Sequence, residues 1–231
     1  MRANLPDPSW FPGKRLPNRQ DLVMIELIGS GNDGHVFRAH SDELQRDFAC
    51  KIIPRANLQD RWRAEVEKAN ALRNPAVVRF ADLRDWTDPK ANIDCVVLVA
   101  DFVDGPNLGK FIAKRRTEIS VPLVVQFLEA MFDLFNEMST VGVTHGDLHA
   151  GNVLVEDRAS YALTGPRFAF RVTDFGVASV TSEARFKDDY LQLAVVLRQL
   201  LEVVNYQTCS PRDKHLFNAL NHQFLARHIR L

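Results

Sequence analysis

The alternation of apolar and polar positions predicts short strands in the first half of the chain. Apolar and β-branched residues gather in short runs that are bounded by glycine, proline and polar residues, which is typical of strands. The predicted strands cover residues 22–28, 36–40, 48–53, 77–83 and 95–102. Between the third and fourth runs, apolar residues recur at helical spacing over 57–73, where Asn57 can cap the helix. The pattern therefore predicts five strands with one inserted helix.

The period becomes helical after Asp104-Gly105-Pro106, which is a turn signal. Helices are predicted over 107–119, 121–141 and 188–204, and residues 214–231 also have a helix-like pattern. Four prolines in the first twenty residues disfavour helix and central strand there. The sequence therefore predicts an α+β protein with a proline-rich arm (1–20), a β-rich N-terminal lobe (21–103) and a mainly helical C-terminal lobe (104–231).

The composition places the chain among globular proteins. Of its 231 residues, 46% are hydrophobic and 25% are charged, which excludes disordered and fibrous classes. Lysine plus arginine and aspartate plus glutamate both number 29, so net charge gives no signal for nucleic acid or an anionic membrane. The first residues lack the apolar core of a signal peptide, and we expect a cytoplasmic protein without a membrane span. The three cysteines show no metal-ligand spacing and are interpreted as reduced packing residues.

A glycine-rich segment separates the first two predicted strands. It reads Gly29-Ser30-Gly31-Asn32-Asp33-Gly34-His35-Val36, and glycines at this spacing let backbone N–H groups approach phosphates closely. A strand rather than a helix follows, which disfavours a dinucleotide-binding unit and favours a loop that covers ATP phosphates. A flexible hairpin turn is the alternative for this segment taken alone.

A lysine in the third predicted strand also requires an explanation. Lys51 lies in the otherwise apolar run Phe48-Ala49-Cys50-Lys51-Ile52, where an unpaired ammonium is costly. Glu65 in the following helix can pair with it and hold the ammonium toward a diphosphate, and Glu67 is the competing partner on another side of the helix. The alternative is a lysine at a strand end whose ammonium reaches solvent.

The strongest chemical signal is the run from Val143 to Leu154, which contains His-Gly-Asp-Leu-His-Ala-Gly-Asn. Asp147 and Asn152 lie five residues apart in a loop, where they can converge on one hydroxyl and one divalent metal. Asp174 follows a second apolar strand, and together with Asn152 it supplies the few oxygen ligands that Mg²⁺ takes from protein. Asp147 is then left as the base.

On these motifs the sequence resembles the eukaryotic-like protein kinase superfamily over roughly residues 21–204. The resemblance implies a bilobal kinase-like fold with a five-stranded antiparallel N-terminal lobe, and the use of ATP and Mg²⁺ as cofactors. The implied ATP-binding residues are Gly29, Ser30, Gly31, Gly34, Val36, Ala49, Lys51, Asp101, Val103 and Leu154. The implied catalytic residues are Asp147, Lys51, Glu65 and His149, and the implied metal ligands are Asn152 and Asp174. Asp189 resembles the aspartate that anchors the catalytic loop.

The sequence also departs from the family pattern. Gly146 replaces the arginine that usually precedes the catalytic aspartate, so control through a phosphorylated activation loop is not expected. His149 stands where serine/threonine kinases usually carry lysine, and the whole motif resembles aminoglycoside phosphotransferases and Rio kinases. Only twelve residues separate Gly176 from Asp189, so the usual peptide platform is missing. The short C-terminal lobe is interpreted as minimal or truncated.

Three functions are consistent with these features. The first is a serine/threonine-type protein kinase that acts on itself or on a protein partner, which the arm or the C-terminal lobe could contact. The second is a small-molecule kinase of the aminoglycoside-phosphotransferase type. The third is a non-catalytic nucleotide-binding pseudokinase module, which the complete catalytic set disfavours. For the arm, packing on its own β-lobe is the alternative to docking a partner.

Overall fold

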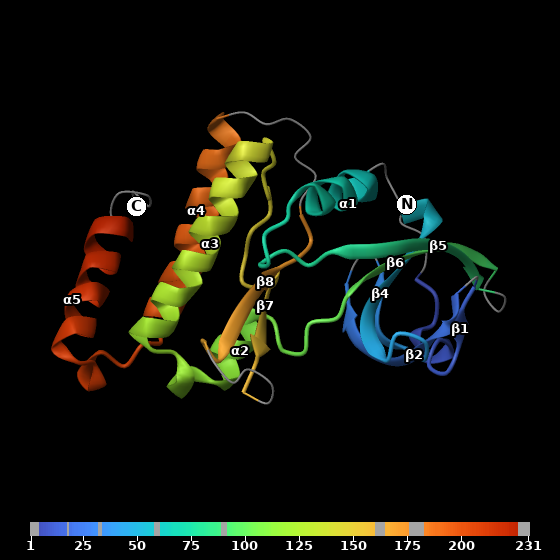
Figure 1. The fold of residues 1–231 in the computed structure, drawn as a ribbon, viewed down its shortest axis with the longest axis horizontal. Coiled ribbons are helices and arrows are strands. Elements are labelled where there is room, and N and C mark those ends of the chain that lie inside the picture. The colour runs from blue at the N-terminus through green and yellow to red at the C-terminus, as the bar shows by residue number, and fades with distance from the viewer. Residues whose placement is uncertain are drawn as a thin grey trace. The chain divides into compact units, whose positions relative to one another are not determined.

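The computed structural model describes residues 5–17, 19–31, 34–57, 61–88, 92–159, 165–175 and 183–225, with only the backbone described at 61–65, 183–187 and 223–225. The chain divides into two compact units (Figure 1). The first comprises residues 1–66 and 78–102, and the second comprises residues 67–77 and 103–231. The first unit carries the large sheet, and the second carries most of the helices.

The first unit is built on an antiparallel sheet whose strand order is β1-β2-β3-β4-β6-β5. Its strands are β1 (Arg15–Leu16), β2 (Arg19–Ser30), β3 (His35–Ser41), β4 (Arg46–Pro54), β5 (Phe80–Asp88) and β6 (Ile93–Asp101). The prediction of five strands is therefore wrong by one, because the arm adds β1 at the edge of β2. Two residues are too few to give an alternating pattern, so this strand has no sequence signal.

The β5 strand begins later than predicted. Val77, the first residue of the predicted strand, instead forms an isolated parallel bridge with Val172 in the second unit. Residues 67–77, which include the end of helix α1 (Arg61–Ala71), also belong to the second unit, whereas the sequence placed them in the N-terminal lobe. Lys68 Nζ donates to the Thr144 carbonyl at 3.3 Å, and the Arg73 amide donates to Glu137 Oε1 at 2.6 Å. These contacts fasten the segment to the second unit.

The main core of the first unit lies on one face of its sheet, and a smaller cluster of Ile53, Val96 and Leu98 lies on the other. Burial alternates along β3 and β4, so that Phe37, Phe48 and Ile52 face this core. The arm closes the core with Phe11, which is 1% exposed and packs its ring 5.2 Å from that of Trp86 on β5. The arm therefore packs on its own β-lobe.

Two cysteines are part of this core and behave as packing residues. Cys50 and Cys95 are both buried and unpaired. Burial raises the pKa of the Cys50 thiol to about 12 and that of Cys95 to about 11. A thiol held protonated in this way is a poor nucleophile, which agrees with the structural role expected from the sequence.

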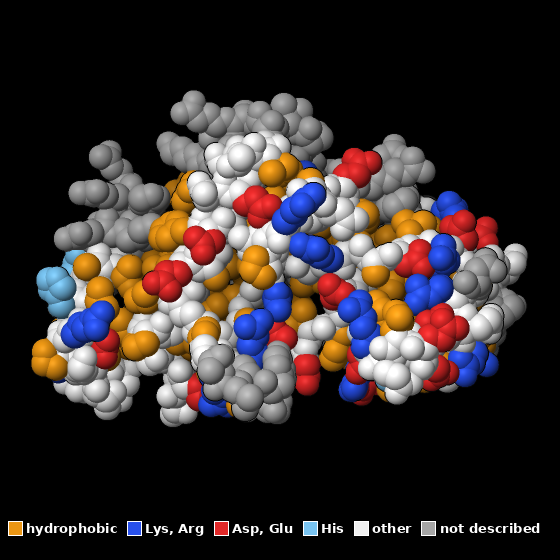
Figure 2. All heavy atoms as spheres, viewed as in Figure 1, with side chains coloured by type: hydrophobic (Ala, Val, Ile, Leu, Met, Phe, Trp, Pro, Cys, Tyr) orange, Lys and Arg blue, Asp and Glu red, His pale blue; other side chains and the backbone are white. Residues whose placement is uncertain are grey.

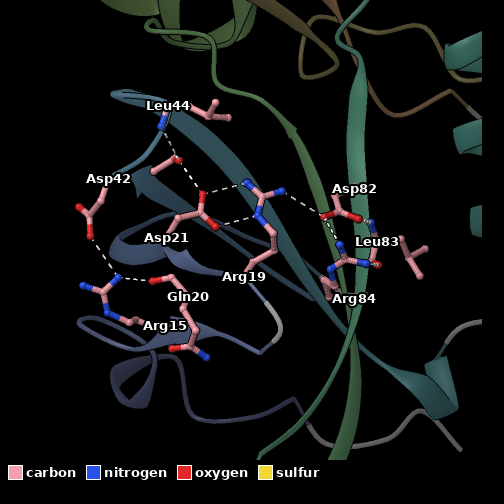
Figure 3. Close-up of polar contacts among 10 residues, drawn as sticks. Arg15, Arg19, Gln20, Asp21, Asp42, Leu44, Asp82, Leu83 and Arg84 are labelled. Atoms are coloured by element: carbon pink, nitrogen blue, oxygen red, sulfur yellow. Dashed lines mark hydrogen bonds and ion pairs between the residues drawn. The ribbon is translucent and has the colours of Figure 1, made fainter.

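An ion-pair network ties the start of β2 to β5 (Figure 3). Arg19 donates through Nε to Asp21 Oδ1 at 2.8 Å and through Nη1 to Asp82 Oδ2 at 3.2 Å. Ser41 donates its hydroxyl to Asp21 Oδ2 at 2.7 Å. The hydrogen bonds from Arg19 and then from Ser41 hold the pKa of Asp21 well below its ordinary value. The pairing keeps β2 and β5 together although they are not neighbours in the sheet.

The second unit combines helices with a two-stranded sheet. Its elements are α2 (Leu108–Lys114), α3 (Val121–Val141), β7 (Val153–Asp157), β8 (Phe168–Val172), α4 (Glu183–Leu201) and α5 (Pro211–Ala219), followed by a π-helical turn (Leu220–Leu225). Helix α3 has the predicted bounds, because the Ser120 side chain caps its first turn and Gly142 ends it with φ 76°. Its apolar stripe packs against β8, α4 and α5. Asn107 caps α2, as predicted.

The surface carries both signs of charge. On the face drawn in Figure 2, basic and acidic side chains alternate over the strands of the first unit without forming a large patch of one sign. This distribution agrees with the balanced composition of the sequence. Among the described residues, no helix is both long and apolar enough to cross a membrane.

Candidate active site

The predicted site residues fall into two sets, one in each unit. In the first unit, Ser30 and His35 are the last residue pair of the β2–β3 hairpin, and the Gly31 amide donates to the Gly34 carbonyl at 3.0 Å. The glycine-rich segment therefore lies between two paired strands, as the sequence predicts. Of its glycines, Gly34 is the one that packing requires, because a Cβ there would overlap the backbone carbonyl of Ile52. Gly31 has open space at the same position.

Lys51 lies in register with the root of this loop. It pairs with Val36 across β3 and β4, and Val36 pairs in turn with Gly29 on β2. Directly opposite residues share a face, so the Val36 and Lys51 side chains lie on the same side of the sheet, as does Ala49 two positions before Lys51. This side is opposite to the main core, and it brings these predicted nucleotide-binding residues together on one surface.

The remaining predicted residues of this set are less fully described. Glu65 lies in α1, but its side chain falls outside the described part of the chain, and so does its predicted pairing with Lys51. Asp101 ends β6 and accepts from Arg46 Nη2 at 2.8 Å. Val103 begins the second part of the second unit.

In the second unit, a buried carboxylate on α4 holds the predicted catalytic loop. Asp189 is fully buried, and it accepts from the His145 amide and from the Gly146 amide, each at 2.8 Å. Burial raises the pKa of this carboxyl group, and the two amide donors oppose that effect. One turn later, Gln192 Oε1 accepts from the Leu148 amide at 2.7 Å. Helix α4 thus fixes the backbone on both sides of Asp147.

The His145 ring supports the loop from inside. Its Nε2–H donates to the Thr173 carbonyl at 3.1 Å, and its Nδ1 accepts from the Asp147 amide at 3.2 Å. Burial lowers the pKa of His145 to about 4, so the ring is neutral at pH 7. Phe175 packs against it with ring centroids 4.8 Å apart. His145 therefore connects the segment that precedes Asp147 to the segment that precedes Asp174.

His149 lies beside the Asp147 carboxylate. Its Nε2 is 3.8 Å from Asp147 Oδ2, and its Nδ1 accepts from the Gly151 amide at 3.0 Å. A Cβ on Gly151 would lie 2.7 Å from His149 Cε1, so glycine there leaves room for the ring. With Nδ1 used as an acceptor, the neutral ring presents an Nε2–H donor next to the predicted base.

Asn152 and Asp174 form the predicted metal pair. Asn152 Nδ2 donates to the Asp147 carbonyl at 2.9 Å, which leaves the amide oxygen Oδ1 as its ligand atom. The Thr173 amide donates to the Asn152 carbonyl at 3.0 Å, so Asp174 directly follows a residue bonded to Asn152. Asp174 also has a left-handed φ of 56°, an uncommon backbone conformation that is often found at functional sites. One amide and one carboxylate oxygen fit the small protein ligand set of Mg²⁺.

Two site features were missed in the sequence. Gln192 lies three residues after Asp189 and therefore on the same side of α4, a spacing that could have identified it. Gly146, seen only as a missing arginine, has φ 81°, a conformation that glycine adopts without strain. Leu154, one of the predicted ATP-binding residues, lies on β7 in register with Arg171 on β8.

Comparison with known proteins identifies the family. A family model described as "Protein kinase domain" matches residues 22–194. Serine/threonine-protein kinase pkn3 of Myxococcus xanthus is 26% identical over 76% of this chain and 31% of its own length. PrkC of Bacillus subtilis is 24% identical over 74% of this chain and 24% of its own length. PknA of Mycobacterium tuberculosis is 26% identical over 68% and 35%, so the chain spans about a third or less of these relatives. The chain belongs to the protein kinase domain family.

Proposed function

We propose that the protein transfers the γ-phosphoryl group of ATP to a serine or threonine hydroxyl of a protein, either its own chain or a partner. The observation that carries this proposal is the anchoring of the catalytic loop by Asp189, because it holds Asp147 and Asn152 in one fixed segment. The similar proteins named serine/threonine-protein kinases support a protein acceptor.

Asp147 is the proposed base. Its carboxylate accepts the proton of the acceptor hydroxyl while the hydroxyl oxygen bonds to the γ-phosphorus. The bond from that phosphorus to the bridging oxygen of the β-phosphate breaks, and ADP leaves. The His145 ring and the Asn152 amide hold the backbone at both sides of Asp147, so its carboxylate is presented without reorganisation.

The other proposed roles concern the phosphates. Lys51 contributes a cation, and the backbone N–H groups of the glycine-rich loop (residues 29–34) contribute donors. Bound Mg²⁺ would neutralise phosphate charge and would be held by Asn152 Oδ1 and the Asp174 carboxylate. His149 would offer its Nε2–H to the γ-phosphate from beside Asp147.

A second candidate function is transfer to a small-molecule hydroxyl. The observation that favours it is His149, because its neutral donor beside Asp147 differs from the lysine of serine/threonine kinases, and its motif resembles aminoglycoside phosphotransferases. The short sequence between Gly176 and Asp189 also favours an acceptor that needs no peptide platform.

The test is incubation of the chain with γ-labelled ATP and Mg²⁺, alone, with generic protein acceptors and with an aminoglycoside. Asp147→Asn should lower the transfer rate by a factor of about 10²–10⁴ while nucleotide still binds, because it removes the base and leaves the loop intact. Asp133→Asn, an exposed carboxylate on α3, is the matched control and should transfer at the normal rate.

The label identifies the acceptor. Label on protein that is lost in Asp147→Asn supports the first function, and label only on the aminoglycoside supports the second. Nucleotide binding without transfer to any acceptor would instead indicate a pseudokinase. Transfer at the normal rate by Asp147→Asn would contradict the assignment of the base.

A further inference from the structure

His35 connects the N-terminal segment to the glycine-rich loop. Its ring is buried, with the residue 5% exposed, and both of its nitrogens are used. Nε2 lies 3.1 Å from the Pro6 carbonyl oxygen, and Nδ1 lies 2.9 Å from Ser30 Oγ. A carbonyl oxygen only accepts, so Nε2 carries a proton and donates to Pro6, and the Nδ1 of the neutral ring accepts from the Ser30 hydroxyl.

The bonded pair lies at the base of the loop. Ser30 and His35 are directly opposite each other on β2 and β3, and the turn between them is closed by the bond from the Gly31 amide to the Gly34 carbonyl. Gly34 is packed closely against the Ile52 carbonyl of β4. The loop is therefore bounded by two residues whose side chains are hydrogen-bonded to each other.

The N-terminal segment that carries Pro6 is itself fixed to the core of the first unit. Phe11 packs its ring 5.3 Å from that of Phe37 on β3, two residues beyond His35. The Gly13 amide donates to the Met24 carbonyl at 2.7 Å. Arg15 donates to the Gln20 carbonyl and, at 3.1 Å, to Asp42 Oδ2 (Figure 3). Residues 5–17, here called the arm segment, are thus held by packing and by hydrogen bonds, and the Pro6 carbonyl is held with them.

We propose that the arm segment is a positioning element of the nucleotide site, and that His35 is the positioning residue that couples it to the glycine-rich loop. The proposal rests on the proposed function, in which this loop binds the phosphates of ATP. If the arm segment holds the loop in its binding conformation, bound nucleotide must stabilise the arm segment by the same factor, because coupling between two sites is reciprocal.

The first measurement is the affinity for a non-hydrolysable ATP analogue with Mg²⁺, determined by calorimetry on the full chain. Ser30→Ala removes the hydroxyl that bonds to His35. His35→Gln replaces the ring by a side chain too short to bond to both Ser30 and the Pro6 carbonyl. Each should weaken binding about fivefold, the factor that corresponds to one typical hydrogen bond. Ser30→Thr keeps the hydroxyl that bonds to His35 and should therefore bind more tightly than Ser30→Ala does. His40→Gln is the matched control, because His40 lies on the same strand and pairs with Asp47 outside this connection.

The second measurement separates coupling from direct contact between Ser30 and the phosphates. Hydrogen exchange of the arm amides, including those of Gly13 and Lys14, is followed with and without saturating analogue. Nucleotide should slow this exchange several-fold in the unmodified chain and in Ser30→Thr, but not in Ser30→Ala or His35→Gln.

The outcomes are distinct. Saturated nucleotide binding with unchanged exchange in the arm segment would overturn the coupling and leave the proposed function intact. Equal protection in the unmodified chain and in Ser30→Ala would also overturn it, because the connection through His35 would then be unnecessary. If the unmodified chain binds no nucleotide at all, the proposed function fails, and the coupling fails with it.

Discussion

Removal of the Asp189 carboxylate should destabilise the second unit by a measurable amount. In Asp189→Ala the His145 amide is left buried without an acceptor, which costs about 1–3 kcal/mol. The Gly146 amide is partly exposed and can bond to water, so its loss is nearer the net value of about 0.5–1.5 kcal/mol. Relief of the buried charge, whose cost is evident in the raised pKa of Asp189, offsets part of this. We expect a net loss of about 1–3 kcal/mol in the free energy of unfolding.

Urea unfolding tests this magnitude with two signals. All three tryptophans lie in the first unit, so circular dichroism at 222 nm reports the helices of the second unit, while tryptophan fluorescence reports the first. With a slope of about 2 kcal/mol per molar urea, Asp189→Ala should lower the midpoint of the dichroism transition by about 0.5–1.5 M. Asp189→Asn keeps one acceptor oxygen and should lower it by about half as much.

The neighbouring exposed Asp188 supplies the control, and Asp188→Asn should change stability by less than about 0.5 kcal/mol. Phosphoryl transfer should also fall, less in Asp189→Asn than in Asp189→Ala, because the loop that presents Asp147 loses its support. An Asp189→Ala chain with an unchanged dichroism midpoint and normal transfer would refute the argument that α4 fixes this loop.

Three further predictions concern the first unit. Phe11→Ala should lower the stability reported by tryptophan fluorescence by about 3–5 kcal/mol, because it removes a buried ring from the core; an unchanged midpoint would mean that the arm segment does not pack there. Gly34→Ala should weaken binding of the ATP analogue at least about tenfold, because its Cβ forces the β4 backbone away. Gly31→Ala, where a Cβ meets open space, should lose less affinity, and equal affinities of the two variants by calorimetry would contradict this. The bond from Arg19 lowers the pKa of Asp21, so the ionised Asp21 carboxylate contributes its full stabilisation above about pH 5. This stabilisation is lost as the pH falls through and below about 4, and Asp21→Asn should flatten the decline in urea midpoint over this range.

The long, regular elements could be predicted closely from the sequence. Helix α3 was predicted to the residue because its apolar stripe is continuous and a serine cap and a left-handed glycine bound it. The start of β5 was not predicted correctly, because Val77 is an apolar residue that does not belong to this strand. It pairs with Val172 of the second unit, and an apolar side chain does not reveal which partner buries it.

The role of the arm could not be predicted from periodicity. Prolines interrupt both the helical and the alternating pattern there, so a single large side chain such as Phe11 carries the contact. Its partners Phe37 and Trp86 are 26 and 75 residues away in the sequence. Contacts of this kind depend on how the whole sheet curls, which no local pattern encodes.

The motif of the catalytic loop predicted which side chains are present, but not what sets its backbone. The sequence marks Gly146 only as the loss of an arginine cation. In the structure Gly146 has φ 81° and donates its amide to Asp189, so glycine meets a conformational requirement at this position. A side chain there would be strained regardless of its charge. Replacement of Gly146 by arginine would therefore strain this backbone, and restoring the cation alone would disturb the segment that presents Asp147.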